Sequence, residues 1–126
     1  MIERRAFIGT AALALLATAA PGLAAGGNME EIYGLIGQLK AVPGKREELI
    51  AILREGTGEM PGNLLYLVAE DLDDPDAIWI TEVWATRTDH ENSLKLPGVQ
   101  AAITRGRPLI AGFGARAQTR PVGYAG

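Results

Sequence analysis

Three side chains in the middle of the sequence have the types and spacing for proton transfer on an aromatic substrate. The single histidine, His90, lies six residues after Trp84. An imidazole can take a proton near neutral pH, as a general base must. Glu82 lies two residues before Trp84, so a strand would place both side chains on one face. A buried carboxylate needs a partner, and we expect Glu82 to orient or charge His90, which would deprotonate a substrate hydroxyl.

Each of these residues also has a plain structural interpretation, which the sequence leaves open. Trp84 can be a core residue, and His90 can lie on the surface or at a helix end. Glu82 can form an ion pair with Arg116 or Arg120 further along the chain.

Two weaker candidates for substrate binding precede this group. Tyr66 can donate a hydrogen bond to a substrate oxygen, although its hydroxyl can equally lie at the sheet edge. Asn63 directly follows Gly62, where turn chemistry also explains an asparagine.

Composition excludes several classes of site. The chain of 126 residues has no cysteine, so it has no disulfide, thiolate metal ligand or cysteine nucleophile. A net charge of −3 gives no electrostatic footprint for nucleic acid or an anionic membrane. The acidic stretch 70–76 lacks the ligand spacing of a calcium loop, and one histidine gives poor support for a transition-metal site.

The first 25 residues have the layout of an export signal. Arg4 and Arg5 precede an uncharged stretch, residues 6–20, and small residues follow Pro21 and Gly22. The paired arginines indicate the twin-arginine route, with the general secretory route as the alternative. We therefore predict a signal peptide over 1–25, a mature domain over 26–126, and a periplasmic or secreted protein that does not bind membrane after cleavage. Loss of Glu3, Arg4 and Arg5 leaves 10 basic and 14 acidic residues, a net charge of −4.

The mature chain alternates strand and helix patterns. Strands are predicted over 32–42, 63–72, 77–85 and 113–122, with helices over 45–55 and 99–110. A short helix should begin near Thr86 or Thr88, because Thr88 and Glu91 have the spacing of a capping box. The order β-α-β-β-α-β predicts an α+β, ferredoxin-like sandwich.

The predicted strands are apolar on both faces. In 63–72 and 77–85 the residues of both alternating sets are mostly apolar. Helices can cover one face only, and the other would leave a large apolar patch. We therefore predict a homodimer in which two sheets pack face to face.

Short motifs in a fixed order resemble the antibiotic biosynthesis monooxygenase family, in particular its quinol monooxygenase branch. The resemblance covers about residues 30–122 and rests on Val42-Pro43-Gly44-Lys45, Pro61-Gly62, Asp74-Pro75, Glu82-Val83-Trp84, Leu96-Pro97-Gly98-Val99 and Arg107-Pro108-Leu109-Ile110-Ala111-Gly112-Phe113. It implies a dimeric α/β-barrel that oxidises quinols or other phenols with molecular oxygen and needs no cofactor. In this family a Trp ends the third strand, a Tyr follows six positions later and an Asn lies four positions earlier. These positions hold Trp84, His90 and Ile80 here, so Ile80 joins the substrate-binding candidates.

The sequence bears on two alternative functions. Relatives that degrade haem carry an Asn, a Trp and an axial His at positions that hold Gly37, Ser93 and Ile103 here, which argues against that activity. The chain can also be a non-catalytic dimeric barrel that binds a small hydrophobic ligand, because a fold alone does not establish catalysis.

Overall fold

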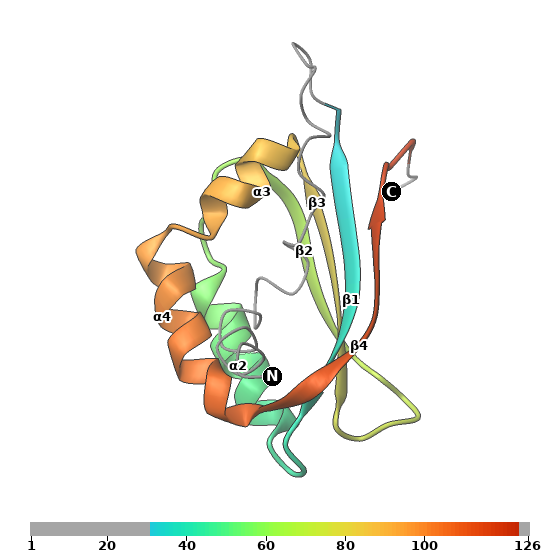
Figure 1. Cartoon of the computed structure of the whole chain (residues 1–126), viewed down its shortest axis with the longest axis vertical. Helices are drawn as coiled ribbons and strands as arrows, with labels where there is room; N and C mark the ends of the chain where they lie inside the picture. The colour runs from blue at the N-terminus through green and yellow to red at the C-terminus, as the bar shows by residue number, and fades with distance from the viewer. Residues whose placement is uncertain (1–30, 124–126) are drawn as a thin grey trace, which may run out of the picture.

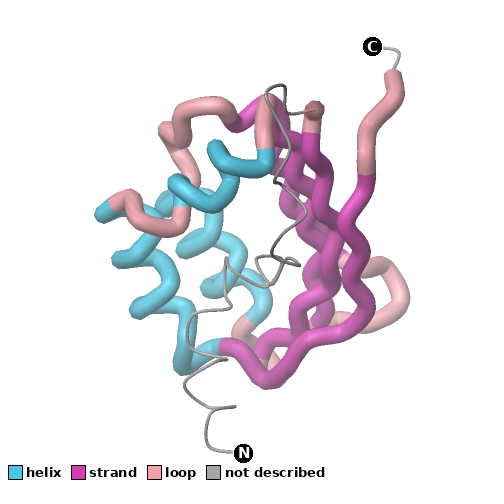
Figure 2. Tube along the Cα trace, turned by 45° about the horizontal axis from the view of Figure 1, so that its top comes forward, coloured by secondary structure: helices cyan, strands magenta, loops and turns pink. Residues whose placement is uncertain are grey.

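The computed structural model describes residues 31–123, which form two layers (Figure 1). The predicted export signal, residues 1–25, lies outside the described residues. One layer is a four-stranded antiparallel sheet, and the helices lie together on one face of it (Figure 2). Within 31–123, no helix is long and apolar enough to cross a membrane.

The elements follow the predicted order. Four strands, three α-helices and a short 3-10 helix are β1 (Tyr33–Ala41), α2 (Arg46–Gly56), β2 (Asn63–Glu70), β3 (Ala77–Trp84), α3 (Arg87–Ser93), α4 (Pro97–Gly106), η1 (Arg107–Leu109) and β4 (Ile110–Thr119). The strand order β2-β3-β1-β4 is that of a ferredoxin-like fold. The predicted fold class is therefore confirmed.

The helix starts agree with the predictions for α3 and differ for α4. The N-cap of α3 is Thr86, one of the two predicted starts, whose hydroxyl accepts a hydrogen bond from the Asp89 amide at 3.0 Å; the capping residue is therefore not Thr88. Helix α4 begins at Pro97 rather than after it, because a proline in the first turn loses no helical hydrogen bond and its φ is already helical.

The core lies between the sheet and the helices. Alternate residues of β1 and β3 point to the helices, and Leu35, Leu39, Ile78 and Ile80 are at most 1% exposed. Helix α2 contributes Leu49 and Leu53, both 0% exposed.

The opposite face of the sheet is apolar and exposed. Leu67 pairs with Thr81, which pairs with Ile36, so the three side chains form a row across β2, β3 and β1. Leu67 is 50% exposed and Ile36 is 37% exposed, and Leu65, on the same face of β2, is 43% exposed. No helix of the described chain covers this face (Figure 1).

The acidic hairpin between β2 and β3 is held by its own hydrogen bonds. Asp71 accepts hydrogen bonds from the amides of Asp73 and Asp74 at 2.8 and 2.9 Å, and from the Trp79 indole at 2.8 Å. Arg46, in the first turn of α2, donates to the carbonyls of Asp71, Asp74 and Ala77. These bonds fix the shape of the hairpin and occupy both oxygen atoms of the Asp71 carboxylate.

Gly62, just before β2, is required by both its backbone and its surroundings. Its φ is +85°, and an added Cβ would overlap the Asp89 carboxyl group and lie 2.6 Å from the Asp89 Cβ. Gly62→Ala is expected to lower the free energy of unfolding by about 2 to 4 kcal/mol. Gly44→Ala is the matched control, because φ there is +83° but nothing lies within 4 Å of the added Cβ; it should cost about 1 kcal/mol. Urea denaturation measures both, and equal losses would contradict the steric part of this prediction.

Candidate active site

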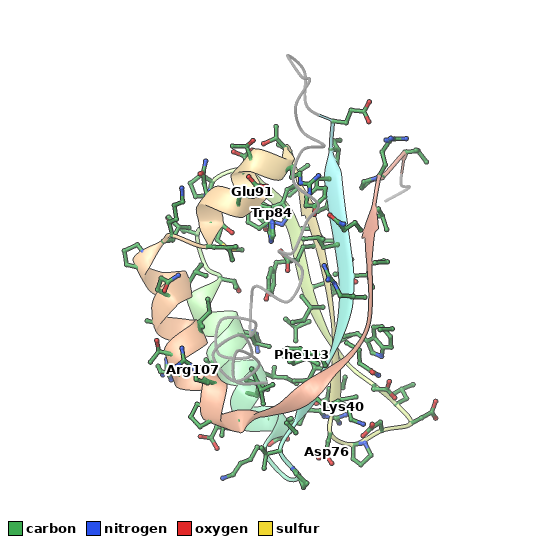
Figure 3. The ribbon with its side chains drawn as sticks, in the orientation of Figure 1. Lys40, Asp76, Trp84, Glu91, Arg107 and Phe113 are labelled. Carbon is green, nitrogen blue, oxygen red and sulfur yellow. The ribbon has the colours of Figure 1, made fainter. Side chains whose placement is uncertain are left out.

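Glu82 and Trp84 form a buried pair at the end of β3. They point to the same, helix-covered face, and the Trp84 indole donates a hydrogen bond to Glu82 Oε1 at 2.9 Å. Trp84 is 1% exposed and Glu82 is 3% exposed. The indole lies between α3 and the strands (Figure 3). The carboxyl group is therefore shielded from solvent, and Arg120, one of its two predicted ion-pair partners, pairs instead with Glu31 at 2.7 Å.

His90 lies on α3 and faces this pair. It is 1% exposed, its ring meets the edge of the Trp84 ring with centroids 5.4 Å apart, and its Nε2 lies 3.9 Å from Glu82 Oε1. That distance is too long for a hydrogen bond, and Nε2 has no hydrogen-bond partner among the described residues. His90 is thus a buried member of the group with Glu82 and Trp84 rather than a surface residue.

Burial shifts both titrations in this group. It raises the pKa of Glu82 from 4.5 to about 7, although the Trp84 hydrogen bond acts in the opposite direction. Burial, helped by the charge of Arg87, lowers the pKa of His90 from 6.5 to about 4. At neutral pH the imidazole is therefore uncharged and Glu82 is close to half ionised. The sequence suggested that Glu82 orients or charges His90; the buried environment favours the neutral imidazole, which leaves the orienting role as the prediction.

Tyr66 links Glu82 to a pocket. On β2 it pairs with Glu82 of β3, so the two side chains are neighbours on one face. Its hydroxyl oxygen is buried and has no hydrogen-bond partner among residues 31–123. Burial, and then the nearby charge of Glu82, raise the Tyr66 pKa well above 10. Together with Arg54, Thr57 and Val68, Tyr66 lines a pocket of about 240 Å³.

The two remaining predicted substrate contacts lie apart from this pocket wall. The Asn63 amide donates to the Leu65 carbonyl at 3.1 Å and to the Val83 carbonyl at 3.4 Å, next to the register shift in β2. Ile80 is 1% exposed in the core and pairs with Val68, which itself lines the pocket. Asn63 therefore stabilises the strand pairing. Ile80 lies on β3, next to the pocket-lining strand β2, and is not itself a lining residue.

The site contains two further groups that were not predicted from the sequence. Tyr33 pairs with Trp84 across β1 and β3, its ring lies 5.8 Å from that of His90, and its hydroxyl donates to Gln118 at 2.5 Å. The pairing of Tyr33 with Trp84 in the β1–β3 register is the signal that could have identified it. Arg54 and Thr57, at the end of α2, line the pocket because of tertiary packing. No short sequence motif predicts that position.

The described residues contain no group of three or more His, Asp or Glu side chains that could hold a metal ion. The positions that hold the haem-binding residues in haem-degrading relatives have other structural roles here. The Ser93 hydroxyl donates to the His90 carbonyl at 2.6 Å. Ile103 is a core residue, 3% exposed, without a ligating atom.

Comparison with known proteins agrees with this fold. The family model described as antibiotic biosynthesis monooxygenase matches residues 32–105. A solved Chloroflexus aurantiacus protein, whose name provisionally assigns it to antibiotic biosynthesis monooxygenases, is 57% identical, with a TM-score of 0.75. The match covers 76% of this chain and 98% of that one. The chain belongs to the antibiotic biosynthesis monooxygenase family. No protein with a curated description matches it.

More distant relatives share the fold of this monooxygenase family. A Pseudomonas aeruginosa protein is 23% identical, with a TM-score of 0.64, and the match covers 77% of this chain and 100% of that one. A Nitrosomonas europaea protein, also provisionally named an antibiotic biosynthesis monooxygenase, is 18% identical, with a TM-score of 0.64 over 75% and 92% of the two chains. At these identities the likeness concerns the fold alone.

Proposed function

We propose that this family member is a cofactor-independent monooxygenase that oxidises a quinol or other phenol with molecular oxygen. The observation that carries the proposal is the buried Glu82 carboxyl group, whose pKa is raised to about 7 and which lies beside a pocket wall. A general base is most effective when its pKa is near the working pH. An ordinary carboxylate is a much weaker base towards a phenol, whose pKa is about 10.

In this proposal the substrate ring occupies the pocket with its hydroxyl group towards Tyr66 and Glu82. The Tyr66 hydroxyl donates a hydrogen bond to the substrate oxygen, and Glu82 takes its proton. His90 Nε2 and Glu82 Oε1 are 3.9 Å apart, so one oxygen atom at about 2.8 Å from each could bond to both. Trp84 holds the carboxyl group in place through its indole N–H. The deprotonated quinol is electron-rich enough to reduce oxygen directly.

The reaction balances without an external reductant. A quinol and one O₂ give a hydroxyquinone and one water: one oxygen atom forms a bond to a ring carbon, and the O–O bond breaks. The other oxygen atom leaves as water with two hydrogens from the quinol. The quinol supplies all the electrons, so nothing besides the substrate and oxygen is consumed.

Oxygen uptake by purified, chelator-treated protein with a panel of quinols tests the proposal. We expect enzyme-dependent consumption with at least one quinol, at a rate well above autoxidation. Binding of a quinol, seen as quenching of tryptophan fluorescence, without any consumption would instead support the non-catalytic hydrophobic-ligand binder.

We also propose that the protein is a homodimer joined through the exposed sheet face. Leu67 lies on that face and is 50% exposed. Leu67→Lys should convert a dimer at micromolar concentration to a monomer, because each copy would bury an unpaired charge. Light scattering after size exclusion measures the mass. Leu72→Lys is the matched control, since Leu72 lies in the hairpin and is 97% exposed; it should remain dimeric. A wild-type monomer would contradict the proposal.

Residues 1–25 are proposed to direct twin-arginine export to the periplasm. Changing Arg4 and Arg5 to Lys keeps the positive charge but removes the paired arginines. We expect the precursor to stay in the cytoplasm, whereas the wild type should appear in the periplasm with Gly26 as its first residue. Cell fractionation with N-terminal sequencing measures this. Unchanged export of the double variant would favour the general secretory route, for which charge alone suffices.

A further inference from the structure

The pocket between α2 and β2 is lined by both a tyrosine and a cationic side chain. Tyr66 and Val68 of β2 form one side, and Arg54 and Thr57 from the end of α2 form the other. Its volume of about 240 Å³ is below the range of about 300 to 1,000 Å³ of pockets for drug-sized ligands. A ligand of one or two rings is the right size.

The Tyr66 hydroxyl needs a partner that the described chain does not supply. Its oxygen is buried and makes no hydrogen bond. Leaving a buried hydroxyl unpaired costs about 1 to 3 kcal/mol in protein measurements. A ligand hydroxyl in the pocket would satisfy it, and this places a phenolic oxygen on the Tyr66 side.

Arg54, from α2, supplies the pocket lining with a positive charge. The other cations of this region are engaged: Arg46 lies 3.4 Å from Glu70, and Lys45 lies 3.6 Å from Glu48. Glu55, which follows Arg54 in the sequence, is bound by Arg105 at 2.6 Å. Among residues 31–123, Arg54 has no ion-pair or hydrogen-bond partner. The Thr57 hydroxyl donates to the Leu53 carbonyl at 2.8 Å, which covers one of the partial negative charges at the end of the helix.

We propose that this pocket binds a small phenol that carries a carboxylate, with its hydroxyl group at Tyr66 and its carboxylate at Arg54. A guanidinium group matches a carboxylate by paired N–H···O bonds. The protein as a whole is acidic, with a net charge of −3, so its overall field does not attract anions. A preference for an anionic ligand must therefore come from the local cation. The inference names the substrate class and rests on the proposed function only for turnover, not for binding.

Binding of two unreactive probes tests the site. 4-Hydroxybenzoate and 4-hydroxybenzamide have the same shape and phenol, but only the first is ionised at pH 7. By calorimetry we expect the benzoate to bind about fivefold more tightly, the scale of an exposed charge pair. Arg54→Gln should abolish that preference. Arg107→Gln removes the same charge from an exposed residue that does not line the pocket, and this variant should keep the preference.

Tyr66→Phe tests the other end of the ligand. It should weaken both probes by a similar factor, about threefold to tenfold, because both present the same hydroxyl group. Thermal unfolding should show no loss of stability, since the variant removes an unpaired polar atom. Equal affinity of the two probes, absence of binding at millimolar concentration, or an unchanged preference in Arg54→Gln would each overturn the inference.

Oxygen uptake separates this inference from the proposed function. If the carboxylate preference depends on Arg54 but neither hydroquinone nor 2,5-dihydroxybenzoate is oxidised, the binding site stands and the monooxygenase proposal fails. If both quinols are oxidised with the same kcat/KM and Arg54→Gln changes neither value, the monooxygenase proposal stands and the substrate class proposed here is wrong.

Discussion

Glu82→Gln is expected to lower kcat with a quinol by about 10²-fold to 10⁴-fold, the range for loss of a general base. Gln has nearly the same shape, and its carbonyl oxygen can still accept the hydrogen bond that Trp84 donates at 2.9 Å. It cannot take a proton. The loss should therefore fall on kcat, with little change in the affinity for 4-hydroxybenzoate.

Two controls separate this role from a structural one. Glu91→Gln neutralises an exposed carboxylate on α3, next in sequence to His90, and should leave kcat unchanged. In the wild type, kcat/KM should rise with pH through about 7, because Glu82 must be ionised to act. A Glu82→Gln enzyme with wild-type kcat, or a profile flat between pH 5 and 8, would exclude Glu82 as the base.

The same group predicts an unusual dependence of stability on pH. The folded-state pKa of Glu82 is raised from 4.5 to about 7, so its stabilising contribution is complete below pH 4.5 and is lost as pH rises through 7. The folded-state pKa of His90 is lowered from 6.5 to about 4, so its contribution is complete above pH 6.5 and is lost as pH falls through 4. Each contribution is about 3 kcal/mol, at 1.36 kcal/mol per tenfold change in proton affinity. Between pH 4.5 and 6.5 the two groups change the free energy of unfolding in opposite directions, and their effects nearly cancel.

Two single substitutions should reveal the pH dependence of stability that each group causes. In Glu82→Gln only the His90 contribution remains, so the free energy of unfolding should rise by about 3 kcal/mol from pH 4 to 6.5. In His90→Phe only the Glu82 contribution remains, and stability should fall by about 3 kcal/mol from pH 4.5 to 7. Urea denaturation at fixed protein concentration measures both. Parallel pH profiles for the wild type and the two variants would show that these groups titrate normally.

Local patterns predicted most of the fold. Runs of apolar and β-branched residues mark β1 and β3 as strands, in which side chains alternate between the two faces, and helical spacing of Leu49 and Leu53 marks α2. The same alternation placed Glu82 and Trp84 on one face, as the structure has them. The start of β4 was placed at 113 instead of 110, because Leu109 and Ile110 fit a helix end and a strand start equally well.

The electrostatics and the pocket could not be read from the sequence, because both depend on tertiary packing. The spacing brought His90 and Glu82 into one group but did not show that both would be at most 3% exposed. That burial reverses the expected charge state of the imidazole. Likewise, Arg54 looks like any exposed residue of a helix until β2 brings Tyr66 and Val68 opposite it.

Oxidation of a quinol under ¹⁸O₂ by chelator-treated protein tests the proposed reaction most directly. We expect one O₂ consumed for each quinol, one labelled oxygen atom in the hydroxyquinone by mass spectrometry, and labelled water as the other product. Glu82→Gln should show neither uptake nor label above the uncatalysed reaction. Unlabelled quinone with hydrogen peroxide as the product would contradict the monooxygenase proposal. So would no oxygen consumption with any quinol, and either result would remove the proposed role of the buried Glu82 carboxyl group.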